Sequence, residues 1–307
     1  MSKYKVKNSI WFVLAEGIKI YFSNIDKFFT YMLFPVFGQI AGIVLAFGLS
    51  LGLADTVASK VDSINKAMLI ILLLAVPGLL IFMKAFWDYM VAYVALNSMT
   101  EGAINTGRVY DFRSHNEVAT RRTFKFVLLL CTVGLFSLIA SNILLAVPGF
   151  ILWIYFILVF QVFTFEEDFT AKECFQRSFE LVKGHWFRTF LIMAILSFFS
   201  IFIISEGITV IFDYLNITEP LCSLLDNLTN HIPLDAINKE LVHYNLDIIT
   251  PEQISYILFG NIITIIVTGL TLPIRSICWT IWYYNLTELK NSQQKRPQRK
   301  RATAQEE

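Results

Sequence analysis

Residues 146–190 read AVPGFILWIYFILVFQVFTFEEDFTAKECFQRSFELVKGHWFRTF, and this stretch decides the fold. Its first part, residues 147–165, carries no charge and is almost wholly apolar. A helix of that length, rising about 1.5 Å per residue, matches a hydrocarbon core of roughly 30 Å. Glu166, Glu167 and Asp168 follow at once, so we expect the helix to leave the bilayer there.

A short amphipathic helix follows this span. Thr170 and Glu173 have the spacing of a capping box, and Gly184 is placed to end the helix. Between them, apolar residues recur on one face and polar residues on the other. The helix could pack in a protein core, but the flanking spans favour a place on the membrane surface. The residues that we assign to contact with anionic lipid headgroups are Lys172, Arg177, Lys183 and Arg188.

The same stretch carries a resemblance to a known family. Its Pro-Gly entry, apolar span, acidic exit and the run RSFELVKGHWFR resemble the membrane domain fused to some glycerophosphodiester phosphodiesterases. They also resemble its stand-alone relatives, the YciC-like bacterial membrane proteins. The closing run PIRSICWTIWYYNLTELK is similar to the proline- and tyrosine-rich close of that family. The resemblance implies a six-span fold and supplies no catalytic residues.

The composition is that of a membrane protein. Apolar residues make up 56% of the 307 residues and charged residues 16%, whereas a soluble domain carries about 25% charged residues. The mean hydropathy is +0.59. Residues 1–7 are polar and no small-residue cleavage site follows them, so we expect the first span to direct insertion.

Six apolar runs have the length of a membrane-spanning helix. We therefore predict an all-α fold, a polytopic transmembrane helical bundle of six spans in three hairpins, with cytoplasmic amphipathic helices. A cytoplasmic segment with an interfacial helix is expected at residues 1–26, a membrane domain at 27–289, and a basic disordered tail at 290–307. The predicted spans cover residues 28–54, 67–90, 123–145, 147–165, 186–212 and 252–284, with an external loop at 216–250.

The interfacial helix of the N-terminal segment is predicted over residues 9–24. Its apolar side chains are expected to share one face, which lies in the membrane surface, with Glu16 and Lys19 opposite. The residues of that face are Trp11, Leu14, Ile18, Tyr21 and Phe22.

The sequence also contains an internal repeat. The sequence LLAVPG occurs at residues 73–78 and again at 144–149. Pro273 is interpreted as a degenerate third copy, and we expect it to kink the sixth span. Chance is the alternative in a chain rich in Leu and Phe, but repeats are common in such folds.

The basic residues gather on one side of the predicted spans. With the N-terminus inside, the surface helices, the connector at residues 101–122 and the tail are cytoplasmic, and the acidic loop at 216–250 is external. We therefore expect a multi-pass protein of a bacterial plasma (inner, cytoplasmic) membrane with both termini in the cytoplasm.

Few charged residues fall within the spans. Lys84 and Asp88 are four residues apart and can pair on one helix face. They would form an ion or proton relay, because charge in a bilayer is costly and often functional. Interfacial pairing is the favoured alternative, since Lys84 lies roughly 26 Å along its span, where a lysine reaches the headgroups. Arg275 falls at a similar depth, and for it both anchoring and headgroup binding are open.

No catalytic constellation is evident. The chain has no HExxH, P-loop or GxSxG motif, and its four cysteines form no CxxC pair. We predict no catalytic residue, no cofactor and no metal site. The chain also has no room for the soluble phosphodiesterase barrel that some relatives carry. The basic tail is interpreted as a topology and lipid signal, so no nucleic-acid partner is expected.

These observations favour a stand-alone membrane module that handles lipids or other amphiphiles, or supports another envelope protein. Its expected partners are membrane lipids, above all anionic headgroups of the cytoplasmic leaflet, and a membrane protein or a second copy of the chain. The alternative is a small-molecule or ion transporter with a path between the hairpins, suggested by the Pro-Gly interrupted spans and the Lys84/Asp88 pair.

Overall fold

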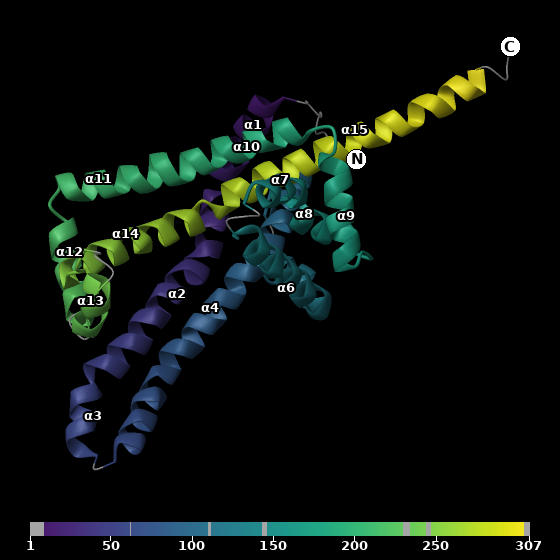
Figure 1. The fold of residues 1–307 in the computed structure, drawn as a ribbon. Coiled ribbons are helices and arrows are strands. Elements are labelled where there is room, and N and C mark those ends of the chain that lie inside the picture. Colours follow the sequence, from purple (N-terminus) through teal and green to yellow (C-terminus); the bar gives the residue numbers. More distant parts are fainter. Residues whose placement is uncertain are drawn as a thin grey trace. The chain divides into compact units, whose positions relative to one another are not determined.

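The computed structural model describes residues 9–61, 63–109, 112–142, 146–229, 234–243 and 247–303, and every element in these ranges is a helix (Figure 1). Six helices or helical runs among them are long and apolar enough to cross a membrane. These are Ile25–Ser50, Asn65–Thr106, Thr123–Ala140, Ala146–Phe165, Trp186–Tyr214 and Pro251–Ser292. The predicted all-α membrane bundle is confirmed, and the chain is a multi-pass membrane protein.

The chain divides into two compact units, which are described separately. The first unit comprises Met1–Tyr31, Met90–Leu196 and Leu272–Glu307, and the second comprises Met32–Tyr89 and Ser197–Thr271. Helices α2 (Ile25–Gly52) and α4 (Ile64–Thr106) contribute residues to both units.

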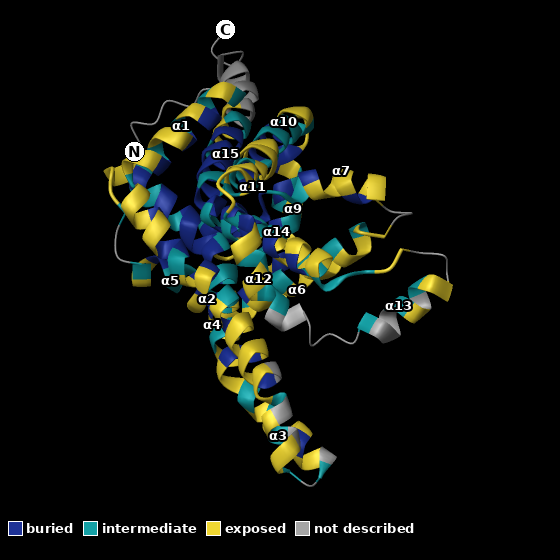
Figure 2. Ribbon diagram, turned by 90° about the vertical axis from the view of Figure 1, so that its left-hand side faces the viewer, coloured by how far each residue is buried: buried dark blue, intermediate teal, exposed yellow. Residues whose placement is uncertain are grey.

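Helix α15 (Leu272–Thr303) is the centre of the first unit. Helices α1 (Ile10–Ser23), α8 (Val159–Phe165) and α9 (Ala171–Val182) pack against it. Its side chains Ile277, Ile281, Trp282 and Leu286 are completely buried, and the dark blue of Figure 2 follows this helix. The remaining helices of the unit are α5 (Phe112–Thr120), α6 (Thr123–Ala140), α7 (Ala146–Phe156) and α10 (Trp186–Ser197).

Helix α14 (Pro251–Leu270) organises part of the second unit. It packs against α12 (Thr218–Thr229) and against η1 (Phe198–Ser205), a π-helical segment. Phe259, Ile263 and Val267 form the apolar core of this contact. The unit also contains α3 (Ala54–Lys60), α11 (Glu206–Tyr214) and α13 (Leu234–His243).

The glycine of the LLAVPG repeat has the same role in both copies. A Cβ atom on Gly78 in α4 would collide with the backbone of Ala46 in α2. A Cβ atom on Gly149 in α7 would lie 2.8 Å from the Cα atom of Ala140 in α6. Close approach through small residues is typical of membrane helices, because van der Waals contact drives their association. Residues 144 and 145 of the second copy lie outside the described ranges.

The predicted helix ends agree with the structure. The Thr170 hydroxyl accepts from the Glu173 N–H while the Glu173 carboxylate accepts from the Thr170 N–H, so the capping box is confirmed. Gly184 has φ +87°, a left-handed conformation that favours glycine. Near Pro273, α14 ends at Leu270 and α15 begins at Leu272, so the helix is interrupted where a kink was predicted.

Two expectations need correction. Helix α15 continues to Thr303, so residues 290–303 of the tail, expected to be disordered, are helical; residues 304–307 lie outside the described ranges. In α1, Leu14 and Tyr21 are buried, whereas the other three residues of the predicted apolar face are exposed, so that face is divided into a buried side and an exposed side. The fourth span is confirmed as the run Ala146–Phe165, in which a short turn separates α7 from α8.

Candidate functional site

The four residues assigned to headgroup contact lie on α9 and around the turn into α10. Lys172, Lys183 and Arg188 are exposed. Arg177 is half-buried instead: its Nε atom donates to Glu166 Oε1 over 3.1 Å, and 25% of its side chain is exposed. The structure thus leaves three of the four cations on the surface and turns the fourth toward protein.

A cationic hollow lies at the turn between α9 and α10. Gly184, His185, Phe187 and Arg188 line this space of about 400 Å³. Burial lowers the pKa of His185, and the positive charges of Arg188 and Lys290 lower it further. Phe187 is 63% exposed at the same turn. The site therefore offers positive charge beside an uncovered aromatic ring.

The apolar face of α9 does not lie on a membrane surface as expected. Phe175 packs edge-on against Phe156 with ring centroids 5.0 Å apart, and Phe179 packs on Tyr155 at 4.5 Å. The Ser178 hydroxyl also donates to the Tyr155 carbonyl over 2.8 Å. Protein from α7 and α8 covers this face, so the protein-core alternative weighed from the sequence describes α9 better.

Lys84 and Asp88 pair in the second unit. Lys84 Nζ donates to Asp88 Oδ1 over 2.5 Å, and it also lies 5.8 Å from the centre of the Phe34 ring. The Lys84 side chain is 63% exposed and that of Asp88 25%. The role of the pair stays a prediction. Arg275 is half-buried in the first turn of α15, in the other unit.

The sequence analysis missed a buried polar cluster in the first unit. Asn97 Oδ1 accepts from Gln161 Nε2 at 3.1 Å, from Ser276 Oγ at 2.6 Å and from Thr280 Oγ1 at 3.2 Å. Asn97 Nδ2 donates to Thr164 Oγ1 at 3.1 Å. All five side chains are buried, and they join α4, α8 and α15. We call these five residues the Asn97 cluster. Polar residues three or four apart in apolar runs were its only sequence signal.

A second set of contacts fixes the acidic segment after α8. Glu166 Oε1, which Arg177 also binds, accepts a 2.9 Å hydrogen bond from the Tyr283 hydroxyl. The Arg122 guanidinium lies 4.3 Å from the centre of the Phe163 ring and donates to the Glu167 carbonyl over 3.0 Å. Burial lowers the pKa of Arg122, although nearby carboxylates act in the opposite direction. Glu166 is thus half-buried and held by two partners from α9 and α15.

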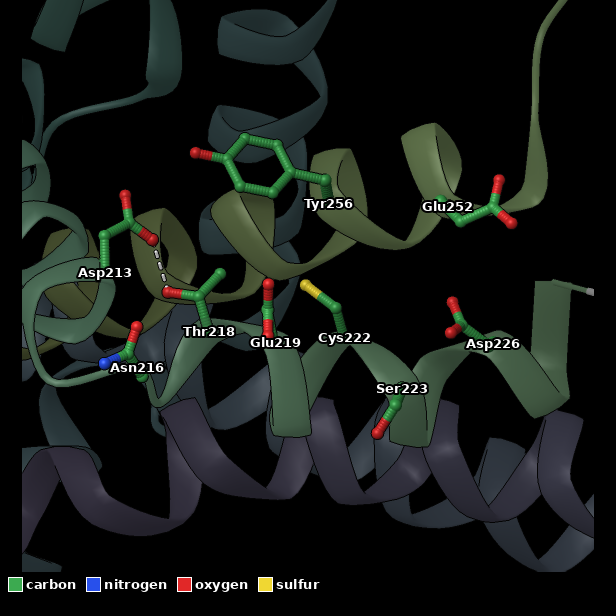
Figure 3. Close-up of a pocket in the computed structure, with 9 residues that line it drawn as sticks. All are labelled: Asp213, Asn216, Thr218, Glu219, Cys222, Ser223, Asp226, Glu252 and Tyr256. Atoms are coloured by element: carbon green, nitrogen blue, oxygen red, sulfur yellow. Dashed lines mark hydrogen bonds between the residues drawn. The ribbon is translucent and has the colours of Figure 1, made fainter.

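The acidic connector of the second unit forms a pocket of about 570 Å³ (Figure 3). Asp213 Oδ1 accepts a 2.5 Å hydrogen bond from Thr218, and Asp226 Oδ1 accepts a 2.6 Å bond from Ser255. Burial, and then Asp226 and Asp213, raises the pKa of the Cys222 thiol. These bonds tie α12 to its neighbours. Among the described residues, no group of three or more His, Cys, Asp or Glu side chains could hold a metal ion.

Comparison with family models, with curated proteins and with solved structures found no match for this chain.

Proposed function

We propose that the chain is a membrane-embedded module that holds anionic amphiphiles at the bilayer face where its lysines and arginines gather. The charge asymmetry favours the cytoplasmic leaflet of a bacterial inner membrane for that face. The resemblance to the membrane domain of glycerophosphodiester phosphodiesterases belongs to the same proposal, in which the module works beside another envelope protein or a second copy.

The cationic hollow carries this proposal. A phosphate headgroup is attracted by Lys183 and Arg188, and the exposed Phe187 ring can contact the apolar part of the same molecule. Arginine binds phosphate with two parallel hydrogen bonds, which adds geometric selectivity to the charge. The side chains that would release or activate a substrate are not part of this arrangement, so binding is the activity that we infer. The exposed Lys84 side chain gives the transport alternative no support.

Neutralising Lys172, Lys183 and Arg188 together to glutamine should lower the preference for anionic over zwitterionic lipid by roughly tenfold to 100-fold. Each basic residue near an anionic surface contributes about 1 kcal/mol, less where water screens it. Native mass spectrometry of the detergent-solubilised protein, titrated with phosphatidylglycerol and with phosphatidylcholine, measures this preference. An unchanged preference in a folded triple variant would contradict the proposal.

Arg177→Gln is the matched control. Its guanidinium is paired with Glu166, so we expect its loss to lower the thermal stability of the protein while the folded fraction keeps its lipid preference. If Arg177→Gln instead weakens lipid binding as much as the triple variant does, the assignment of the three exposed cations as the binding set is wrong.

Anion binding should also raise the pKa of His185. Burial, and then the charges of Arg188 and Lys290, hold that pKa below its usual value, and a bound phosphate offsets those charges. By linkage, affinity for the anion should increase as the pH falls through and below about 6.5, the usual histidine pKa. NMR titration of labelled histidines with and without a short-chain phosphatidylglycerol measures the shift. His243 in the second unit is the internal control, and a His185 pKa that ignores the lipid would count against the site.

A further inference from the structure

Helix α1 has two apolar faces, and protein covers one of them. Val13, Leu14, Gly17 and Tyr21 are buried where α1 packs on α15. A second row of apolar side chains remains uncovered in the first unit, and Figure 2 shows α1 with both buried and exposed turns. This outer stripe consists of Trp11, Ile18 and Phe22, which are 73%, 44% and 61% exposed.

The buried face fixes the rotation of α1 about its axis. Cys278 Sγ lies 3.8 Å from the Val13 carbonyl, to which it donates, and Gly17 leaves the space that this sulfur occupies. Tyr21 stacks on Phe28 with ring centroids 6.1 Å apart. Because α1 cannot turn without losing these contacts, the outer stripe stays turned away from α15.

The joint to the first span holds α1 next to the bilayer. Helix α1 ends at Ser23 and α2, which begins the first span, starts at Ile25. The intervening Asn24 donates from Nδ2 to the Ile20 carbonyl over 3.1 Å, so the joint is itself hydrogen-bonded. Because the linker is this single residue, α1 must stay close to the headgroup region where the span begins.

The polar residues of α1 complete the geometry of an in-plane helix. At about 100° per residue, the outer stripe lies between the protein face and the side that carries Glu16 and Lys19. Lys19 Nζ is 3.9 Å from Glu16 Oε1, and 73% of the Lys19 side chain is exposed. Going around the helix, one side meets protein, the next is apolar and uncovered, and the next is charged. An interfacial helix has this order of apolar and charged sides.

We propose that the outer stripe inserts into the lipid leaflet, so that α1 contacts lipid on one side and α15 on another. The occupant of the stripe is lipid, because α1 is joined by one residue to a membrane span and its charged residues Glu16 and Lys19 lie on another side of the helix. Insertion then couples lipid packing to the helix that carries Ser276 and Thr280 of the Asn97 cluster. This inference does not depend on the headgroup site at α9 and α10.

Site-directed spin labelling of the full chain in phosphatidylcholine–phosphatidylglycerol vesicles tests the proposal. Labels are placed one at a time through Trp11→Cys, Ile18→Cys and Phe22→Cys, with Glu16→Cys and Lys19→Cys on the same helix as matched controls. Cys131 and Cys222 are replaced by serine, and Cys174 and Cys278 are buried. We expect the ratio of oxygen to water-soluble nickel-chelate accessibility to be several-fold higher at the stripe than at the controls.

Two results would overturn the proposal. A ratio at the stripe equal to that at Lys19 would place the stripe in water, and low accessibility to both reagents would mean that protein covers it. Quenching of tryptophan fluorescence by brominated lipid, compared between the unaltered protein and Trp11→Phe, gives an independent reading without labels. The fraction of emission assigned to Trp11 should be quenched by the lipid and resist aqueous iodide; iodide quenching alone would contradict insertion. The triple headgroup variant should show the same stripe accessibility, so failure of either proposal is distinguishable from failure of the other.

Discussion

Asn97→Leu should destabilise the first unit by about 3 kcal/mol, because several buried partners lose their bond at once. Ser276 and Thr280 can turn to carbonyls one helical turn earlier, which lowers their cost. Gln161 has no such option, since its Oε1 atom already has no hydrogen-bond partner in the described structure and its Nε2 would lose Asn97. Denaturant unfolding of the detergent-solubilised protein measures the difference in free energy.

Two further variants separate this explanation from simple loss of packing. Thr280→Val removes one donor from the cluster and should cost about 1 kcal/mol or less. Asn97→Leu combined with Gln161→Leu should be more stable than the sum of the single effects predicts, because no amide is then left unpaired in an apolar site. Strict additivity of the two substitutions would contradict the account of the Asn97 cluster.

The helices could be predicted because local physics decides them. Apolar length set the six spans, and the cap at Thr170 set the start of α9, which the structure confirms. In lipid each helix must satisfy its own backbone hydrogen bonds, so no tertiary partner is needed to specify it. What each face of α9 contacts, by contrast, depends on which other helices pack against it.

Arg177 shows why the site was predicted only in part. Its spacing places it with the lysines of α9, and nothing local distinguishes it from them. Glu166, which also accepts from Tyr283, pairs with Arg177 only once α8, α9 and α15 are packed together. Asn97 was missed for the same reason: its side-chain partners lie 64 to 183 residues away along the chain, and nothing local distinguishes it from the polar residues that follow it in α4.

Gly78→Ala should destabilise the hairpin of α2 and α4 by roughly 1–3 kcal/mol, despite alanine being the better helix former. The added methyl would meet the backbone of Ala46 and lie 2.6 Å from the Gly42 carbonyl oxygen. A backbone cannot rotate away as a flexible side chain can, so the helices must separate. The other helix of the hairpin is as close, since a Cβ atom on Gly42 in α2 would lie 2.7 Å from the Phe82 Cα atom in α4.

Gly48→Ala on α2 is the matched control, because a Cβ there meets nothing within 4 Å. That substitution should leave stability unchanged or raise it by up to about 1 kcal/mol, the difference in helix propensity. The two variants make the same chemical change in one unit, so opposite signs isolate the contact between helices. Thermal unfolding in detergent, with distances between spin labels on α2 and α4, follows both effects. If Gly78→Ala is as harmless as Gly48→Ala, the hairpin does not depend on that close approach, and the shared role of the two LLAVPG glycines fails with it.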